Sequence, residues 1–210
     1  MPFTPQQFFD AFVAYNSAIF PVQFALLGCA LLIVICANAR SADANRFAVF
    51  GLGLLWLWSA IAYHWWHFSK VTPAAWIFGA MFLLEGMLLI GSASGVSFDH
   101  RRGGRRAGFL LVAYALAVYP LTAVLAGHSY PAQATFGAPC PVTIFTIGLL
   151  VAMRPPLPIK LAIIPLLWAL IATSAAFRLG VSEDFALLGS AIVLVIASIV
   201  RRTSVTPATP

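Results

Sequence analysis

Charged side chains are scarce in this sequence: Asp, Glu, Lys and Arg make up only 9% of its 210 residues. In an ordinary soluble domain they make up roughly a quarter. Together with the 61% of residues that are apolar, this scarcity excludes a typical soluble enzyme domain. The sequence contains only three cysteines. They lie at different depths within the apolar runs, so a disulfide framework is also excluded. It shows no nucleotide-binding loop and no nucleic-acid module.

The apolar residues are grouped in runs that suit a bilayer, whose core of about 30 Å needs roughly 20 residues of helix. Seven runs qualify, although the fifth is short. They are Ala18–Asn38, Arg46–Phe68, Pro73–Ser94, Ala107–Ala126, Cys140–Met153, Leu157–Phe177 and Ser182–Val200. The short connections leave no room for a soluble domain. We therefore predict an all-α fold, a polytopic membrane helix bundle with seven transmembrane helices over residues 18–200.

The two ends of the chain differ from these runs. The first residues lack the basic leader of a cleavable signal peptide. Thr4, Pro5 and Gln7 match a helix start with a cap, a proline at the first position and a capping-box partner. We predict a short interfacial helix over residues 1–17, with an extension of the first span as the alternative. Residues 201–210 are expected to form a disordered cytoplasmic tail.

Basic residues alternate between the loops. Of the twelve Lys and Arg residues, only Lys70 and Arg178 lie after even-numbered spans. The positive-inside rule assigns the loops with more Lys and Arg to the cytoplasm. The N-terminus is therefore predicted outside and the C-terminus in the cytoplasm, so the net charge of +6 reports topology rather than nucleic-acid binding.

Residues able to bind a metal gather at the predicted outer surface, where nitrogen, sulfur and carboxylate ligands suit a zinc or copper ion. The candidate ligands are His64, His67, His128, Cys140, Glu183 and Asp184. His64 and His67 are three residues apart and are expected to share a helix face. We expect both to approach one cavity with Cys140 and one of the acids. The alternatives are an aromatic belt at YHWWHF and acids that only favour a helix start.

Cys140 lies between two prolines in the stretch FGAPCPVTIF, at the start of the fifth predicted span. Pro139 disfavours helix for the residue before it, and Pro141 suits the first helical position. The positive end of the helix dipole there favours a thiolate. With Thr143 and Thr146 on nearby faces, the site fits a soft-metal ligand, a nucleophile or part of a solute path. A small capping residue is the alternative.

One acid, Glu85, lies inside the third predicted span, roughly 18 Å from its outer end at about 1.5 Å per residue. A carboxyl at that depth should face the bundle interior, and a functional role is the default hypothesis. The alternative is a neutral acid bonded to a neighbouring helix. Its expected partners are Gln23, Thr146 and Ser59. The predicted transport or binding residues are Glu85, Gln23, Asn16, Cys140, Thr143 and Thr146.

Three stretches, AYNSAIFPVQ, GHSYPAQATFGAPCPVTIFTIG and GVSED, resemble a family of bacterial integral membrane proteins of about this length, known only as a domain of unknown function. The resemblance covers nearly the whole chain. It implies a multi-pass protein of the bacterial inner membrane, and it implies no activity and no site residues.

Two classes of function fit these patterns. The first is a small transporter or channel-like carrier for a cation or small solute, with Glu85 as its midplane site. The second is a membrane-embedded hydrolase or transferase that uses a metal or Cys140; an accessory subunit without a site of its own is a third. The isolated midplane acid favours transport over an enzyme. The expected partners are the lipid bilayer and a small solute or ion, with a homo-oligomer left open and no nucleic acid.

Overall fold

The computed structural model describes residues 3–99 and 103–203, and these residues form helices and connections without a named strand. Two of the elements, η1 and η3, are π-helical, and η2 and η4 are short 3₁₀ turns. In chain order the elements are α1 (Pro5–Ile19), α2 (Val22–Asn38), α3 (Ala42–Trp58), η1 (Ser59–Trp65), η2 (Phe68–Lys70), α4 (Ala74–Ser92), α5 (Gly103–Ala113), η3 (Tyr114–Val118), α6 (Tyr119–Leu125), α7 (Pro139–Ala152), α8 (Lys160–Leu179), η4 (Ser182–Asp184) and α9 (Phe185–Thr203).

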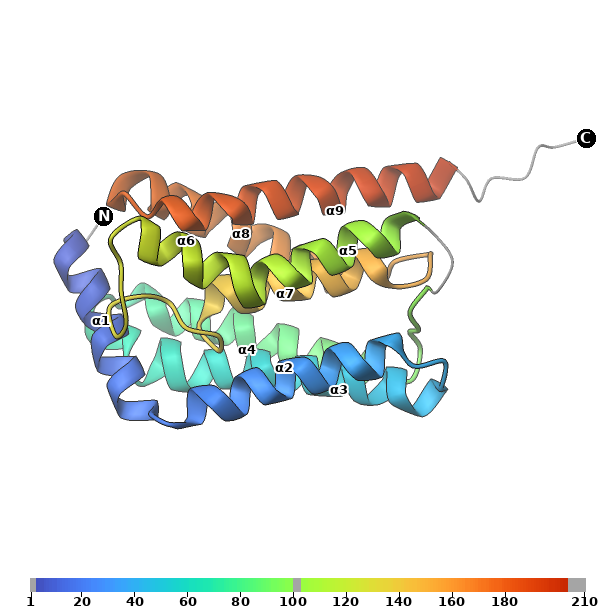
Figure 1. Ribbon diagram of the computed structural model, residues 1–210, viewed down its shortest axis with the longest axis horizontal. Coiled ribbons are helices and arrows are strands. Elements are labelled where there is room, and N and C mark those ends of the chain that lie inside the picture. Colours follow the sequence, from blue (N-terminus) through green and yellow to red (C-terminus); the bar gives the residue numbers. More distant parts are fainter. Residues whose placement is uncertain (1–2, 100–102, 204–210) are drawn as a thin grey trace, which may run out of the picture.

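Most helices run side by side along one axis, and α1 lies across one end of the bundle (Figure 1). Helix α3 packs between α2 and α4, while α7 packs against α5, α8 and α9. Contacts between α4 and α8, and between α3 and α7, join these two groups. The end covered by α1 also holds the connections before α4, α7 and α9 (Figure 1).

The all-α prediction is confirmed, but the count of full-length spans is lower than predicted. Five helical stretches are long and apolar enough to cross a membrane, and they are Ala42–Lys70, Ala74–Ser92, Gly104–Leu125, Lys160–Leu179 and Ser182–Val200. The other two predicted spans are shorter, because α2 has 17 residues and α7 has 14. Helices α1 and α2 reach the required length only as a pair, and that pair is bent by 87°.

The predicted start of α1 is confirmed in detail. Thr4 Oγ1 accepts a hydrogen bond from the Gln7 backbone N–H at 3.3 Å, and Gln7 Oε1 accepts one from the Thr4 N–H at 2.9 Å. The helix ends at Ile19 because Pro21, with no N–H and a bulky ring, cannot continue it. It is therefore a separate element from α2. At the other end of the chain α9 continues to Thr203, and the rest of the predicted tail, residues 204–210, lies outside the described residues.

Helix α7 occupies the centre of the bundle, and all fourteen of its residues are buried. Its C-terminal end pairs with a neighbouring segment, since the Asp99 N–H donates to Ala152 O at 2.9 Å and the Arg154 N–H, just beyond the helix, donates to Ser97 O at 2.8 Å. A short helix is tolerated at membrane depth when protein, rather than lipid, surrounds its ends. The length of α7 is therefore consistent with a bundle that lies in a bilayer.

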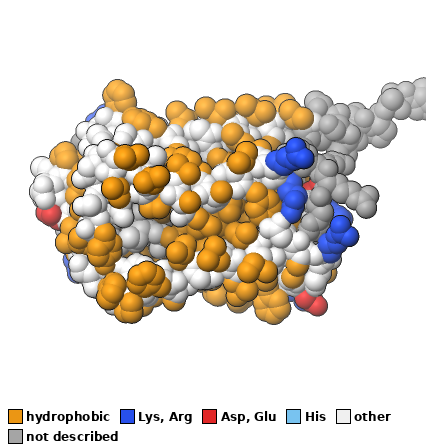
Figure 2. Space-filling view, viewed as in Figure 1, with side chains coloured by type: hydrophobic (Ala, Val, Ile, Leu, Met, Phe, Trp, Pro, Cys, Tyr) orange, Lys and Arg blue, Asp and Glu red, His pale blue; other side chains and the backbone are white. Residues whose placement is uncertain are grey.

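The surface of the bundle separates apolar sides from a basic end. Apolar side chains cover the flank in view, and Lys and Arg gather mainly at the end opposite α1 (Figure 2). The large exposed side chains include Phe24, Leu110 and Phe177. Apolar flanks with basic residues at one end are what a positive-inside membrane protein requires.

Candidate functional site

A buried carboxylate links three elements at the end covered by α1. The Tyr119 hydroxyl at the start of α6 donates a hydrogen bond to Asp184 Oδ1 at 2.5 Å. The Cys140 thiol near the start of α7 donates to Asp184 Oδ2 at 3.3 Å. All three side chains are buried. Asp184, the last residue of η4, therefore holds α6 and α7 against the beginning of α9.

The neighbouring acid has a different partner. Glu183 Oε1 lies 2.9 Å from His128 Nδ1, and Glu183 is buried while His128 is partly exposed. The imidazole also lies against the Phe9 ring, with the ring centroids 4.3 Å apart. Four of the six predicted metal ligands thus meet at this end, as two separate pairs.

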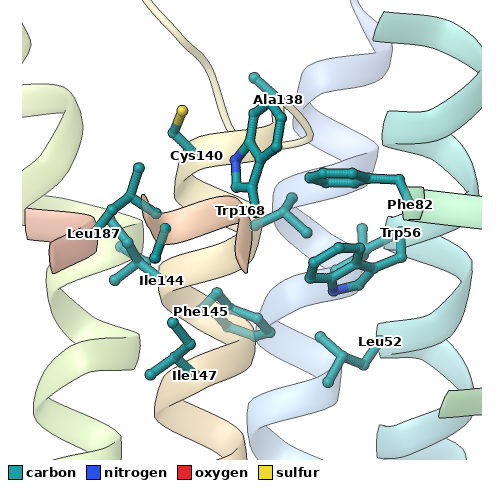
Figure 3. Packing of buried hydrophobic residues seen from close by; sticks show 14 of the residues in the cluster. Leu52, Trp56, Phe82, Ala138, Cys140, Ile144, Phe145, Ile147, Trp168 and Leu187 are labelled. Carbon is teal, nitrogen blue, oxygen red and sulfur yellow. The ribbon is translucent and has the colours of Figure 1, made fainter. Parts of the chain in front are cut away.

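An aromatic cavity of about 170 Å³ lies beside these pairs, under α1. Its polar lining includes Asp184, Cys140, Thr72 and Ser174. Its aromatic lining includes Phe8, Phe12, Tyr63, Phe68, Phe78 and Trp168. Trp168 lies between Cys140 and Phe82, with its indole nitrogen on the side of the ring turned toward Cys140 (Figure 3). That nitrogen lies near the Cys140 sulfur but makes no hydrogen bond of normal geometry among the described residues.

The two histidines of η1 and its C-terminal turn do not line this cavity, which corrects the prediction that they approach it with Cys140. His64 is fully buried among rings, with centroids 4.8 Å from Phe82 and 5.2 Å from Trp168. His67 Nδ1 instead lies 2.6 Å from the Ala62 carbonyl oxygen. The π-helical turn is the reason, because its wider winding breaks the three-residue spacing that places side chains on one α-helical face.

The predicted zinc or copper site is not assembled. Across residues 3–99 and 103–203, no group of three or more His, Cys, Asp or Glu side chains lies close enough to hold a metal ion. Cys140 and Asp184 form one pair and His128 and Glu183 the other. A closed zinc site needs four ligands.

The proline analysis is right that Ala138 is not helical, but α7 starts at Pro139 and not at Pro141, and the state of the thiol also differs from the prediction. Ala138 is extended (φ −76°, ψ 157°) and Pro139 occupies the first helical turn. Because Cys140 Sγ donates to a carboxylate, the structure holds a thiol and not the expected thiolate. The two threonines of the helix donate to its own backbone, Thr143 to Pro139 O at 2.8 Å and Thr146 to Val142 O at 2.7 Å.

Asn16 and Gln23 have the contacts of structural residues. Asn16 Nδ2 donates to the carbonyl oxygens of Pro131 and Gln133, both at 2.7 Å. Its Oδ1 accepts from the Thr135 hydroxyl at 2.6 Å. Gln23 Nε2 donates to the Asn16 carbonyl oxygen at 2.7 Å. These bonds fix the connection before α7 onto α1 and join α1 to α2.

Glu85 faces the interior, as predicted, and is fully buried on α4. Neither of its carboxyl oxygens has a hydrogen-bond partner among the described residues. The predicted partners are therefore wrong. Gln23 bonds to the backbone, Thr146 accepts from Trp56 Nε1 at 2.8 Å, and Ser59 donates to Gly137 O at 2.8 Å. Each of them satisfies a group nearer to itself.

Three buried polar side chains without partners occupy neighbouring elements: Trp168 on α8, His64 on η1 and Glu85 on α4. The His64 ring contacts both Trp168 and Phe82, and Phe82 precedes Glu85 by three residues on the buried face of α4. Buried polar groups are nearly always paired, so each exception needs an explanation. We call these three residues the polar track: ring contacts join Trp168 to His64, and Phe82, which His64 also contacts, lies about one helical turn from Glu85.

Sequence reasoning missed Tyr119 and Trp168. Tyr119 is 65 residues from its partner Asp184, so no local spacing connects them. Both residues lie in apolar runs, where a single aromatic residue is most simply explained as core. Their only signal is that a buried hydroxyl or indole N–H usually requires a partner.

Comparison with known proteins identifies a family and no relative of known function. Neither the curated proteins nor the solved structures contain a match. A family model described as a family of unknown function, DUF6064, matches residues 5–208. Because that match covers nearly the whole chain, the chain belongs to the DUF6064 family of unknown function.

Proposed function

We propose that the protein is a multi-pass carrier of the bacterial inner membrane that moves a small solute or cation. The cavity under α1 is the solute site, with Asp184 and Cys140 as its polar groups. Glu85 is the group that takes up and releases a proton, and His64 lies between the two. The N-terminus is outside and the C-terminus is in the cytoplasm.

The observation that supports this proposal is the polar track between the cavity and Glu85. From Ala74 to Glu85 the α4 axis rises about 16 Å at about 1.5 Å per residue, which brings the carboxyl near the middle of the helix. An ionisable group at that depth is expensive and usually marks an ion or proton pathway. A carboxyl, an imidazole and an indole N–H without partners, on three packed elements, supply sites for a proton or for ordered water.

The geometry favours a carrier over a cysteine-dependent enzyme. A cysteine nucleophile of the cysteine–histidine type needs a histidine base within hydrogen-bond reach. The partner of Cys140 is Asp184, while His128 pairs with Glu183 and His67 with a backbone oxygen. His64 makes no hydrogen bond among the described residues.

The proposed orientation predicts that reporters inserted after Arg106 and after Ser129 lie on opposite sides of the membrane. The first position is at the basic end and the second follows the helix to the end covered by α1. Alkaline phosphatase should be active only at the second position, and green fluorescent protein should fluoresce only at the first. Activity of one reporter at both positions would contradict the orientation.

Carrier activity can be tested before the solute is known. We expect purified protein in vesicles that enclose a pH-sensitive dye to change the internal pH when a transported solute is added outside. A panel of small organic cations, zwitterions, carboxylates, sugars and alkali ions covers the chemistry that the cavity admits. Protein-free vesicles are the control. The proposal fails if no member of the panel changes the internal pH, or enters the vesicles, faster than in that control.

A further inference from the structure

Aromatic rings from five elements, α1, η1, η2, α4 and α8, form part of the wall of the cavity under α1. Phe12 of α1 stacks on Tyr63 of η1, with ring centroids 5.3 Å apart. Tyr63 stacks in turn on Phe68 at 5.6 Å. Phe78 and Trp168 meet edge to face at 5.3 Å on the other side. Such rings carry negative electrostatic potential on their faces and positive potential at their edges, so a positive charge is favoured where a face not covered by another ring borders the cavity.

The acidic group in the cavity wall is Asp184. Both of its oxygens accept hydrogen bonds, from Tyr119 and from Cys140, and these bonds offset part of the cost of burying a charged carboxylate. Neither donor is a cation. The nearest histidine of this end, His128, is paired with Glu183. Among the described residues Asp184 makes no ion pair with Lys, Arg or His, so its charge is not neutralised by a direct partner.

We propose that this cavity binds a small organic ammonium ion. The aromatic faces attract the apolar, weakly hydrated head of the cation, and Asp184 neutralises its charge. Trp168 is 6% exposed and lines the same cavity, and its indole N–H lies near the Cys140 sulfur without a hydrogen bond of normal geometry, so it can donate to a hydroxyl or carbonyl oxygen on the ligand. The inference deepens the proposed function by naming its substrate class, and it depends on that function for transport but not for binding.

The size of the cavity limits the ligand. Its volume of about 170 Å³ is close to that of engineered cavities of about 150 Å³ that hold a benzene molecule. A choline-sized ion fits this space and a long-chain amine does not. Small inorganic cations are disfavoured, because the rings cannot replace their hydration shell and no cluster of metal ligands is present among the described residues.

The test compares two ligands of nearly equal shape on the full-length protein in detergent. Choline carries a quaternary nitrogen, and 3,3-dimethyl-1-butanol carries an uncharged carbon in its place. Isothermal titration calorimetry should show choline binding more tightly by about tenfold or more, which is about 1.4 kcal/mol. Equal affinities, or no choline binding at millimolar concentration, would overturn the proposal.

Variants identify the groups responsible. Asp184→Asn should weaken choline binding by about tenfold or more, whereas Asp10→Asn, a change at an exposed carboxylate on α1, should leave it unchanged. If Asp184→Asn does not yield folded protein, Phe12→Leu provides the second test. It removes one ring from the wall and should weaken choline more than the neutral alcohol. Unchanged choline binding in Asp184→Asn, or equal weakening of both ligands in Phe12→Leu, would contradict the proposal.

Transport separates this inference from the proposed function. Choline that binds but never enters the vesicles leaves the ammonium site standing and refutes the carrier. Transport of other solutes by a protein that does not bind choline or tetramethylammonium supports the carrier and refutes the ammonium site.

Discussion

Replacing Gly148 with alanine is expected to remove most of the folded protein. A Cβ at this position would lie 2.6 Å from the Gly108 carbonyl oxygen, and a Cβ at Gly108 would lie 2.4 Å from the Gly148 carbonyl oxygen. Both obstacles are backbone atoms, so α5 and α7 must separate to admit one methyl group. Because every residue of α7 is buried, the helix has no free direction in which to move. We expect a loss of about 3 kcal/mol or more.

The measurement is the melting temperature and the yield of monodisperse protein in detergent. Replacing glycine with alanine within a helix normally stabilises the protein by about 0.5–1 kcal/mol. For Gly148→Ala we expect the opposite effect, a loss of stability. Gly189→Ala in α9 is the matched control, since no atom lies within 4 Å of its Cβ position, and it should melt at the wild-type temperature or above it. A Gly148→Ala protein that melts as high as this control would show that the two helices are not in contact at these glycines.

The helix ends were predictable because their signals are local. The capping box at Thr4 and Gln7 acts within a few residues, and the structure shows that helix start. The prolines around Cys140 located the start of α7 to within two residues. The apolar runs likewise coincide with helices within a few residues. The run lengths, however, could not distinguish α7, which is surrounded by protein, from a lipid-facing span, because both are equally apolar.

The candidate site was only partly predictable from the sequence. Depth along the spans grouped Cys140, Glu183, Asp184 and His128 at one end, where two pairs form. The prediction that His64 shares a cavity with Cys140 is wrong, because it assumed the α-helical period through a turn that is π-helical. A π-helix has no clear sequence signal.

Replacing Glu85 with methionine is expected to raise the melting temperature of the protein. Both carboxyl oxygens are buried without a hydrogen-bond partner in the described part of the chain. An unsatisfied buried polar group costs about 1–3 kcal/mol, and methionine fills a similar volume without that cost. Leu89→Met is the matched control, because Leu89 is a buried residue on the same face of α4 and a volume-conserving swap there usually costs less than about 1.5 kcal/mol.

The same Glu85→Met change is expected to abolish solute-driven pH changes in dye-loaded vesicles, because a thioether cannot take up a proton. Glu85→Gln should also abolish them, since an amide keeps the shape and polarity of the acid but not its titration. A carrier that keeps a destabilising group for its function becomes more stable and inactive when that group is removed. Removal of an acid that only stabilises the fold would instead lower the melting temperature and leave transport intact. Full coupling in either variant would rule out the proton-carrying role. A marked fall in the melting temperature of Glu85→Met, with Leu89→Met unaffected, would instead show that the carboxyl stabilises the fold.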